Sequence, residues 1–204
     1  MKDGLRFGPL GEEAAHICVD MQNLFAPGAP WGAQWVETTL PTIEMLTAAL
    51  APRTFFTRFI PPRSLVDAPG SWGRYYGSWP QVLRDELLPI WLELLPRLHR
   101  LARSGQIYDK SVYSPWAQTN LEATLRRLGI STLVISGAET DICVLATVLG
   151  AVDRGFRVVV ATDAVCSSAD ETHDAALRLF RSRLGQQIET ATAGQILAAW
   201  HDNS

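Results

Sequence analysis

Histidine and cysteine are both scarce in this 204-residue chain. It has four histidines, none at a spacing typical of metal ligands, and three cysteines with no Cys-x-x-Cys pair. An odd number of cysteines without paired spacing does not indicate a disulfide framework. The sequence therefore predicts free thiols in a cytoplasmic protein and no bound metal.

Charged residues are also few, and long apolar runs are absent. Charged residues make up 19% of the chain, against about 25% in an average globular domain, while hydrophobic residues make up 47%. This balance indicates large buried surfaces, including a subunit interface, so we expect a homo-oligomer, either a dimer or a tetramer. A net charge of -3 gives no indication of nucleic acid or an anionic membrane as a partner. No run reaches the roughly 18 apolar residues of a spanning helix, and residues 1–13 lack the apolar stretch of a signal peptide.

Short β-like runs alternate with helix-like runs along most of the chain. The predicted strands are Ala15–Val19, Thr54–Phe59, Gln106–Tyr108, Thr132–Ile135, Arg157–Ala161 and Gln187–Glu189. The predicted helices are Thr38–Leu50, Pro80–Arg103, Leu121–Leu128, Ile142–Arg154, Asp170–Arg183 and Ala193–Trp200. This alternation is typical of a parallel sheet with helices on both faces. We therefore predict one domain over residues 1–204, a three-layer α/β/α, Rossmann-like fold with a mostly parallel six-stranded sheet.

Two features of this pattern bear on ligands. No Gly-x-Gly-x-x-Gly follows the first predicted strand, which argues against a dinucleotide cofactor. Residues 61–81 interrupt the alternation with prolines, glycines and several aromatic residues. Loops of this length are often lids or binding loops. The alternative is that these aromatic side chains pack on the surface or in a dimer contact.

Reactive side chains follow three of the predicted strands. Asp20 follows the first, Lys110 the third, and Cys143 lies after the fourth, at the start of a predicted helix. The unpaired N–H groups of a helix start favour a thiolate. Since ligands collect at the carboxyl ends of parallel strands, we expect these three groups to converge there if their strands are neighbours. Lys110 would then favour the thiolate, while Asp20 would accept the thiol proton and deliver it to a leaving amine.

Three motifs resemble the isochorismatase-like cysteine hydrolase superfamily, which includes nicotinamidases, N-carbamoylsarcosine amidases and ureidoacrylate amidases. They are Val19–Phe25 (VDMQNLF), Asp109–Ser114 (DKSVYS) and Gly137–Val144 (GAETDICV). The match spans roughly residues 15 to 168, in the same order as in that family. The resemblance implies the isochorismatase-like hydrolase fold for the whole domain.

The resemblance also implies roles for particular residues. Asp20, Lys110 and Cys143 would form the family's catalytic triad. A cis peptide bond between Ala138 and Glu139 would direct the N–H groups of Glu139 and Cys143 toward one point, as an oxyanion hole. A thioester on Cys143 would then be the intermediate of the reaction.

One departure from the family narrows the expected chemistry. Nicotinamidases hold a metal after the second strand with aspartate and histidines, whereas residues 57–62 here contain neither. We therefore expect the metal-free amidohydrolase branch, with no cofactor, cleaving the C–N bond of a small amide, carbamoyl or ureido substrate. The presence of Cys143 favours this reaction because some isochorismatases, which cleave a vinyl ether, lack the cysteine. The alternatives are a vinyl-ether or ester hydrolase of the same fold and a non-catalytic interaction protein that uses the aromatic loop.

Substrate contacts are predicted from aromatic residues near the strand ends and from one arginine. Arg58, at the end of the second strand, would bind a substrate carboxylate or pair with an acid elsewhere. The aromatic residues would line a pocket for a flat or apolar acyl group, or belong to the core or an interface. These aromatic candidates are Phe25, Trp72, Trp79, Tyr113 and Trp116.

Overall fold

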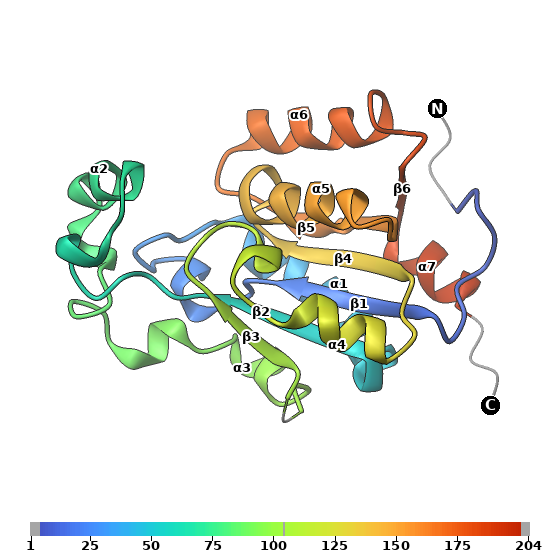
Figure 1. Ribbon diagram of the computed structural model, residues 1–204, viewed down its shortest axis with the longest axis horizontal. Coiled ribbons are helices and arrows are strands. Elements are labelled where there is room, and N and C mark those ends of the chain that lie inside the picture. The colour runs from blue at the N-terminus through green and yellow to red at the C-terminus, as the bar shows by residue number, and fades with distance from the viewer. Residues whose placement is uncertain (1–4, 104, 201–204) are drawn as a thin grey trace.

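The computed structural model describes residues 5–103 and 105–200 and shows a β-sheet flanked by helices (Figure 1). Its strands follow the order β3-β2-β1-β4-β5-β6, and each neighbouring pair is parallel. The strands are β1 (Ala14–Val19), β2 (Thr54–Phe59), β3 (Ile107–Lys110), β4 (Thr132–Ala138), β5 (Arg157–Cys166) and β6 (Ile188–Ala191). The α/β prediction is confirmed, and this sheet is parallel throughout.

Helices cover both faces of the sheet because its central strands are apolar on both sides. In β1, Ile17 packs into one core and Cys18 into the other, as the two-residue period of a strand requires. Residues from α4 (Leu121–Arg127), α5 (Leu145–Asp153) and α6 (Asp170–Arg181) fill the first core. Residues from α1 (Trp35–Ala49), α3 (Pro96–His99) and α7 (Ala193–Ala199) fill the second. No helix in the described parts of the chain is long and apolar enough to cross a membrane.

Two segments differ from the sequence prediction. Residues 80–103, predicted as one helix, form short turns, with α-helix confined to α3. Pro89 and Pro96 each begin a new turn, because proline lacks the N–H that a continuing helix needs and clashes with the preceding turn. Residues 61–81, predicted as a loop, include the helix α2 (Ser71–Ser78), which lies to the left of the sheet in Figure 1.

A buried histidine, His16, lies in the middle of β1. Its ring nitrogens lie 3.2 Å from the Thr54 hydroxyl of β2 and 2.7 Å from the Ser136 hydroxyl of β4. Burial lowers the pKa of His16 to about 3. The ring is therefore neutral in the native protein at neutral pH, and its two nitrogens join three adjacent strands.

Acid is expected to destabilise the protein through His16. An unfolded histidine titrates near pH 6.5, so between about pH 6.5 and 3 the unfolded chain binds the extra proton and the native chain does not. The free energy of unfolding should therefore fall by up to about 1.4 kcal/mol per pH unit in this window, with no contribution from His16 above it. Urea unfolding of His16→Gln between pH 7 and 4.5 should show a shallower pH dependence than the wild type. An unchanged slope in His16→Gln would contradict the prediction.

Candidate active site

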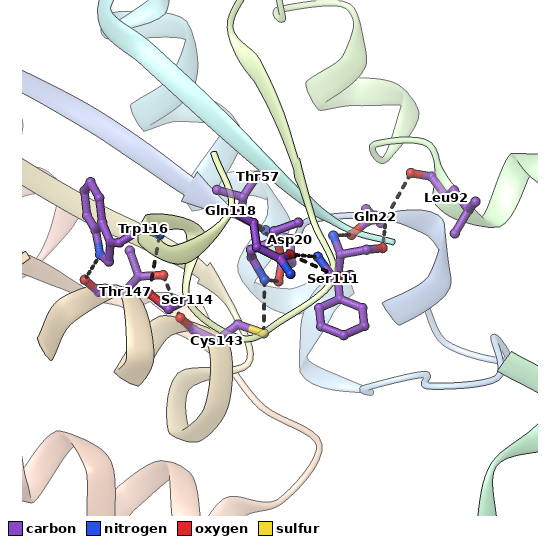
Figure 2. Close-up of polar contacts among 12 residues, drawn as sticks. Asp20, Gln22, Thr57, Leu92, Ser111, Ser114, Trp116, Gln118, Cys143 and Thr147 are labelled. Atoms are coloured by element: carbon purple, nitrogen blue, oxygen red, sulfur yellow. Dashed lines mark hydrogen bonds and ion pairs between the residues drawn. The ribbon is translucent and has the colours of Figure 1, made fainter. Parts of the chain in front are cut away.

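The three reactive residues predicted from the sequence meet at the carboxyl ends of the strands. Asp20 follows β1, Lys110 ends β3, and Cys143 lies in a π-helical turn, Thr140–Val144, after β4. The Lys110 Nζ atom lies 2.6 Å from the Asp20 Oδ2 atom and 3.5 Å from the Cys143 Sγ atom. Figure 2 shows the side chains of Asp20 and Cys143. β2 separates β3 from β1 in the sheet, so the long lysine side chain is needed to span the extra strand.

Residues of β2 and the loop after β1 hold the Asp20 carboxylate in place. Asp20 has a positive φ of 49°, and its backbone N–H donates to the Thr57 carbonyl oxygen at 3.2 Å. The Thr57 hydroxyl donates to the Asp20 Oδ1 atom at 2.5 Å (Figure 2). Thr57 and Lys110 therefore each occupy one carboxylate oxygen. Gln22 connects the loop after β1 to β2. Its side-chain amide donates to the Phe59 carbonyl oxygen and accepts from the Phe59 N–H. Sequence reasoning missed Thr57; its place in the predicted second strand was the available signal.

The nucleophile loop depends on a close approach between β1 and β4. Gly137 has a φ of 111°, and a Cβ atom at this position would lie 2.1 Å from the Val19 carbonyl oxygen. Only glycine permits this packing without displacing the backbone. The next peptide bond, Ala138–Glu139, is cis, as the resemblance implied. Two residues after it in the π-helical turn, the Asp141 carboxylate accepts a hydrogen bond from the Ser167 hydroxyl at 2.5 Å, which ties the loop to the end of β5.

The ionisation of Cys143 differs from the sequence prediction, which was a thiolate favoured by the helix start. Burial raises the pKa of Cys143 well above its ordinary value, and Asp20 raises it further, while Lys110 partly opposes them. Burial by itself would lower the pKa of Lys110, but Asp20 and Cys143 raise it above its usual value. The resting site is thus a neutral thiol beside an ammonium–carboxylate pair. Asp20 is paired with the same ammonium that contacts the thiol, which makes its carboxylate a candidate base for Cys143.

Cys143 lines a cavity of about 420 Å³. Four predicted contacts lie in its wall: Phe25, Trp72, Trp79 and Tyr113. Sequence reasoning missed three further aromatic residues of the wall, Trp31, Phe59 and Tyr75. α2 and the residue after it supply Trp72, Tyr75 and Trp79, so the segment predicted as an aromatic loop forms one side of the cavity.

The structure places two predicted contacts outside this cavity. Arg58 binds both carboxylate oxygens of Asp109, at 2.8 and 2.9 Å, and also binds Glu93 at 2.9 Å. Arg58 and Phe59 are consecutive in β2 and point to opposite sides, so only Phe59 lines the cavity. The Trp116 indole donates to the Thr147 carbonyl oxygen at 2.9 Å (Figure 2) and is buried in the core.

The described residues include no group of three or more His, Cys, Asp or Glu arranged to hold a metal ion. A metal-free site stays a prediction. All three cysteines are free and buried, and Cys18 and Cys166 lie apart from the cavity.

Comparison with known proteins identifies the family of this chain. The sequence-family model of the isochorismatase domain matches residues 14–192 of this chain. Maleamate amidohydrolase of Pseudomonas putida (KT2440) is 27% identical over 202 residues, covering 95% of this chain and 91% of that protein. The isochorismatase family protein PncA of Bacillus subtilis (strain 168) is 40% identical over 98 residues, covering 47% of this chain and only 54% of that protein.

The fold has a close structural counterpart. The crystal structure of a cysteine hydrolase from Pseudomonas syringae pv. phaseolicola 1448A superposes with a TM-score of 0.81 at 22% identity, covering 97% of each chain. The family model covers most of the present chain, including the three strand ends that carry Asp20, Lys110 and Cys143. The chain therefore belongs to the isochorismatase family of hydrolases.

Proposed function

We propose that this protein is a cysteine-dependent amidohydrolase that cleaves the C–N bond of a small amide, carbamoyl or ureido substrate through a thioester. The observation that carries the proposal is the buried contact among Asp20, Lys110 and Cys143, of which Cys143 lines a substrate-sized cavity. Relatives of this family that act on amides, such as the maleamate amidohydrolase, support C–N cleavage.

The geometry suggests how the first half of the reaction proceeds. Asp20 accepts the thiol proton as the Cys143 sulfur attacks the substrate carbonyl carbon. The ammonium of Lys110 stabilises the thiolate while this proton moves. Backbone N–H groups of Glu139 and Cys143 serve as donors to the carbonyl oxygen, which becomes negative in the tetrahedral intermediate.

The second half regenerates the thiol. Asp20 protonates the nitrogen as the C–N bond breaks, which leaves the acyl group on sulfur as a thioester. Asp20 then takes a proton from a water molecule, whose oxygen attacks the thioester carbonyl. The acid leaves, and the Cys143 sulfur regains a proton from Asp20. One carboxylate thus moves every proton, without a histidine.

Release of ammonia tests the reaction class. A panel of primary amides, ureas and carbamoyl compounds should include substrates that yield ammonia and acid in equal amounts, and turnover should survive treatment with a metal chelator. Matched esters and vinyl ethers test the alternative of the same fold. Hydrolysis of these without any ammonia-releasing substrate would contradict the proposal, and no turnover at all would favour the interaction protein.

Two further predictions accompany this function. The low share of charged residues supports a homo-oligomer, a dimer or tetramer, which light scattering would measure.

Three free, buried cysteines fit a cytoplasmic location, where thiols stay reduced.

A further inference from the structure

The cavity next to Cys143 has acidic side chains in its wall and no basic ones. Glu139 and Asp141 line it, whereas none of its lining residues in the described parts of the chain is lysine, arginine or histidine. Lys110 lies behind this wall, and its charge is balanced by Asp20 at 2.6 Å. The charge that a substrate meets in this cavity is therefore negative.

Neither carboxylate is neutralised by the protein itself. Glu139 accepts a hydrogen bond from the Ser168 backbone N–H at 2.9 Å, and Asp141 accepts from the hydroxyl groups of Ser167 and Thr172. No ion pair joins either of them to a cationic side chain within residues 5–103 and 105–200. These donors are uncharged, so none of these contacts places a cationic side chain of the described residues on either carboxylate.

The remaining wall is built from aromatic rings in mutual contact. The Trp31 ring lies 5.9 Å from that of Phe25, 5.7 Å from that of Phe59 and 6.1 Å from that of Tyr75. Burial raises the pKa of Tyr75 to about 12, so its hydroxyl stays neutral at neutral pH. The faces of such rings attract cations, and more strongly where water is excluded.

An anionic substrate finds no counterpart here. Arg58, the arginine that the sequence suggested for a substrate carboxylate, is held by Asp109 and Glu93 outside the cavity. A carboxylate in the cavity would face Glu139, Asp141 and the negative faces of the rings. A cation with an apolar surface would instead meet these acidic residues and the aromatic rings.

We propose that the substrate is an amide whose acyl part carries a positive charge on an apolar body, such as a quaternary ammonium group. This inference rests on the proposed function, since it names the substrate class of the same site. A cavity of about 420 Å³ has room for such a molecule. Hydrolysis would turn the neutral amide into a carboxylate, so the product is a zwitterion. The carboxylate of this product has no cationic partner among the residues that line the cavity, which favours release of the product.

Three amides of similar size and different charge test the preference. Trimethylammonioacetamide is cationic, 3,3-dimethylbutanamide is its neutral isostere, and malonamate is anionic. We expect kcat/KM for the cationic amide to exceed that for the neutral isostere by on the order of tenfold, and malonamate to be slower still. Asp141→Asn and Glu139→Gln should each reduce the cation-to-neutral ratio of kcat/KM. A malonamate rate equal to or above that of the neutral isostere would overturn the proposal.

A second experiment tests the charge preference without relying on amide hydrolysis. Two methanethiosulfonate reagents, one with a trimethylammonium group and one with a sulfonate group, both modify thiols. After division by their rates with free cysteine, the cationic reagent should modify Cys143 at least about tenfold faster, and Asp141→Asn should lower this ratio. Cys143→Ser identifies the modified residue. Equal normalised rates would overturn the charge preference, whereas a preserved ratio without any amide turnover would overturn the proposed function alone.

Discussion

Replacing Cys143 with alanine is expected to lower kcat for ammonia release by at least about a thousandfold, because it removes the atom that forms the thioester. The side chain is buried and small, so the substitution should cost the native fold about 1 kcal/mol. Assays of ammonia release with the purified variant, together with urea unfolding, separate loss of chemistry from loss of structure.

Another buried thiol in the chain provides a matched control. Cys166 at the end of β5 is as buried as Cys143 but does not line the cavity. Cys166→Ala should keep kcat within a few-fold of the wild type. An acyl group trapped on the wild-type protein by acid quenching should be found on Cys143 by mass spectrometry. If Cys143→Ala retained a tenth of the activity, the thioester route would be wrong.

Replacing Lys110 with methionine should abolish activity and also lower the free energy of unfolding by about 3–5 kcal/mol. The side chains of Lys110 and Asp20 are both 0% exposed, and their charged atoms lie 2.6 Å apart. Methionine keeps most of the lysine's volume but leaves the Asp20 carboxylate buried without a cation. Urea unfolding at pH 7 measures the loss, and ammonia release measures the chemistry.

The double variant Asp20→Asn/Lys110→Met separates the destabilising effect of an unpaired buried charge from the effect of altered packing. Since no unpaired charge remains in it, the double variant should be more stable than Lys110→Met, yet it should stay inactive. The exposed pair between Arg63 and Asp85 is a control, because Arg63→Met should cost less than about 1 kcal/mol. A Lys110→Met variant as stable as the control, or a double variant no more stable than Lys110→Met, would contradict a stabilising buried pair.

The sequence predicted elements best where a hydrophobic period was continuous. The run Thr132–Ile135 was predicted as a strand and lies inside β4, because an apolar run bounded by loops has few other ways to be buried. Residues 80–103 were mispredicted as a helix because the prediction followed their leucine-rich composition and gave too little weight to Pro89 and Pro96 in the interior of the segment. A leucine-rich composition indicates that a segment is buried, but prolines in its interior prevent the segment from forming one continuous helix.

The residues of the candidate triad could be predicted because they follow strand ends. The protonation of the Cys143 thiol could not be predicted from the sequence. Asp20, Lys110 and Cys143 each follow a strand, and parallel strands bring such positions to one edge. The neutral thiol follows from burial and from the nearby Asp20 carboxylate, neither of which the chain order reveals.

The sequence by itself determined a parallel α/β fold and the three strand ends that carry the candidate chemistry, because hydrophobic periods and motif positions are local properties. Only the tertiary structure decided what surrounds the thiol. It showed that Thr57 holds the carboxylate and that Arg58 is occupied elsewhere, and it placed Glu139 and Asp141 beside the aromatic wall. These arrangements depend on strand register and on which face each side chain takes, and both are set by contacts between residues far apart in the chain.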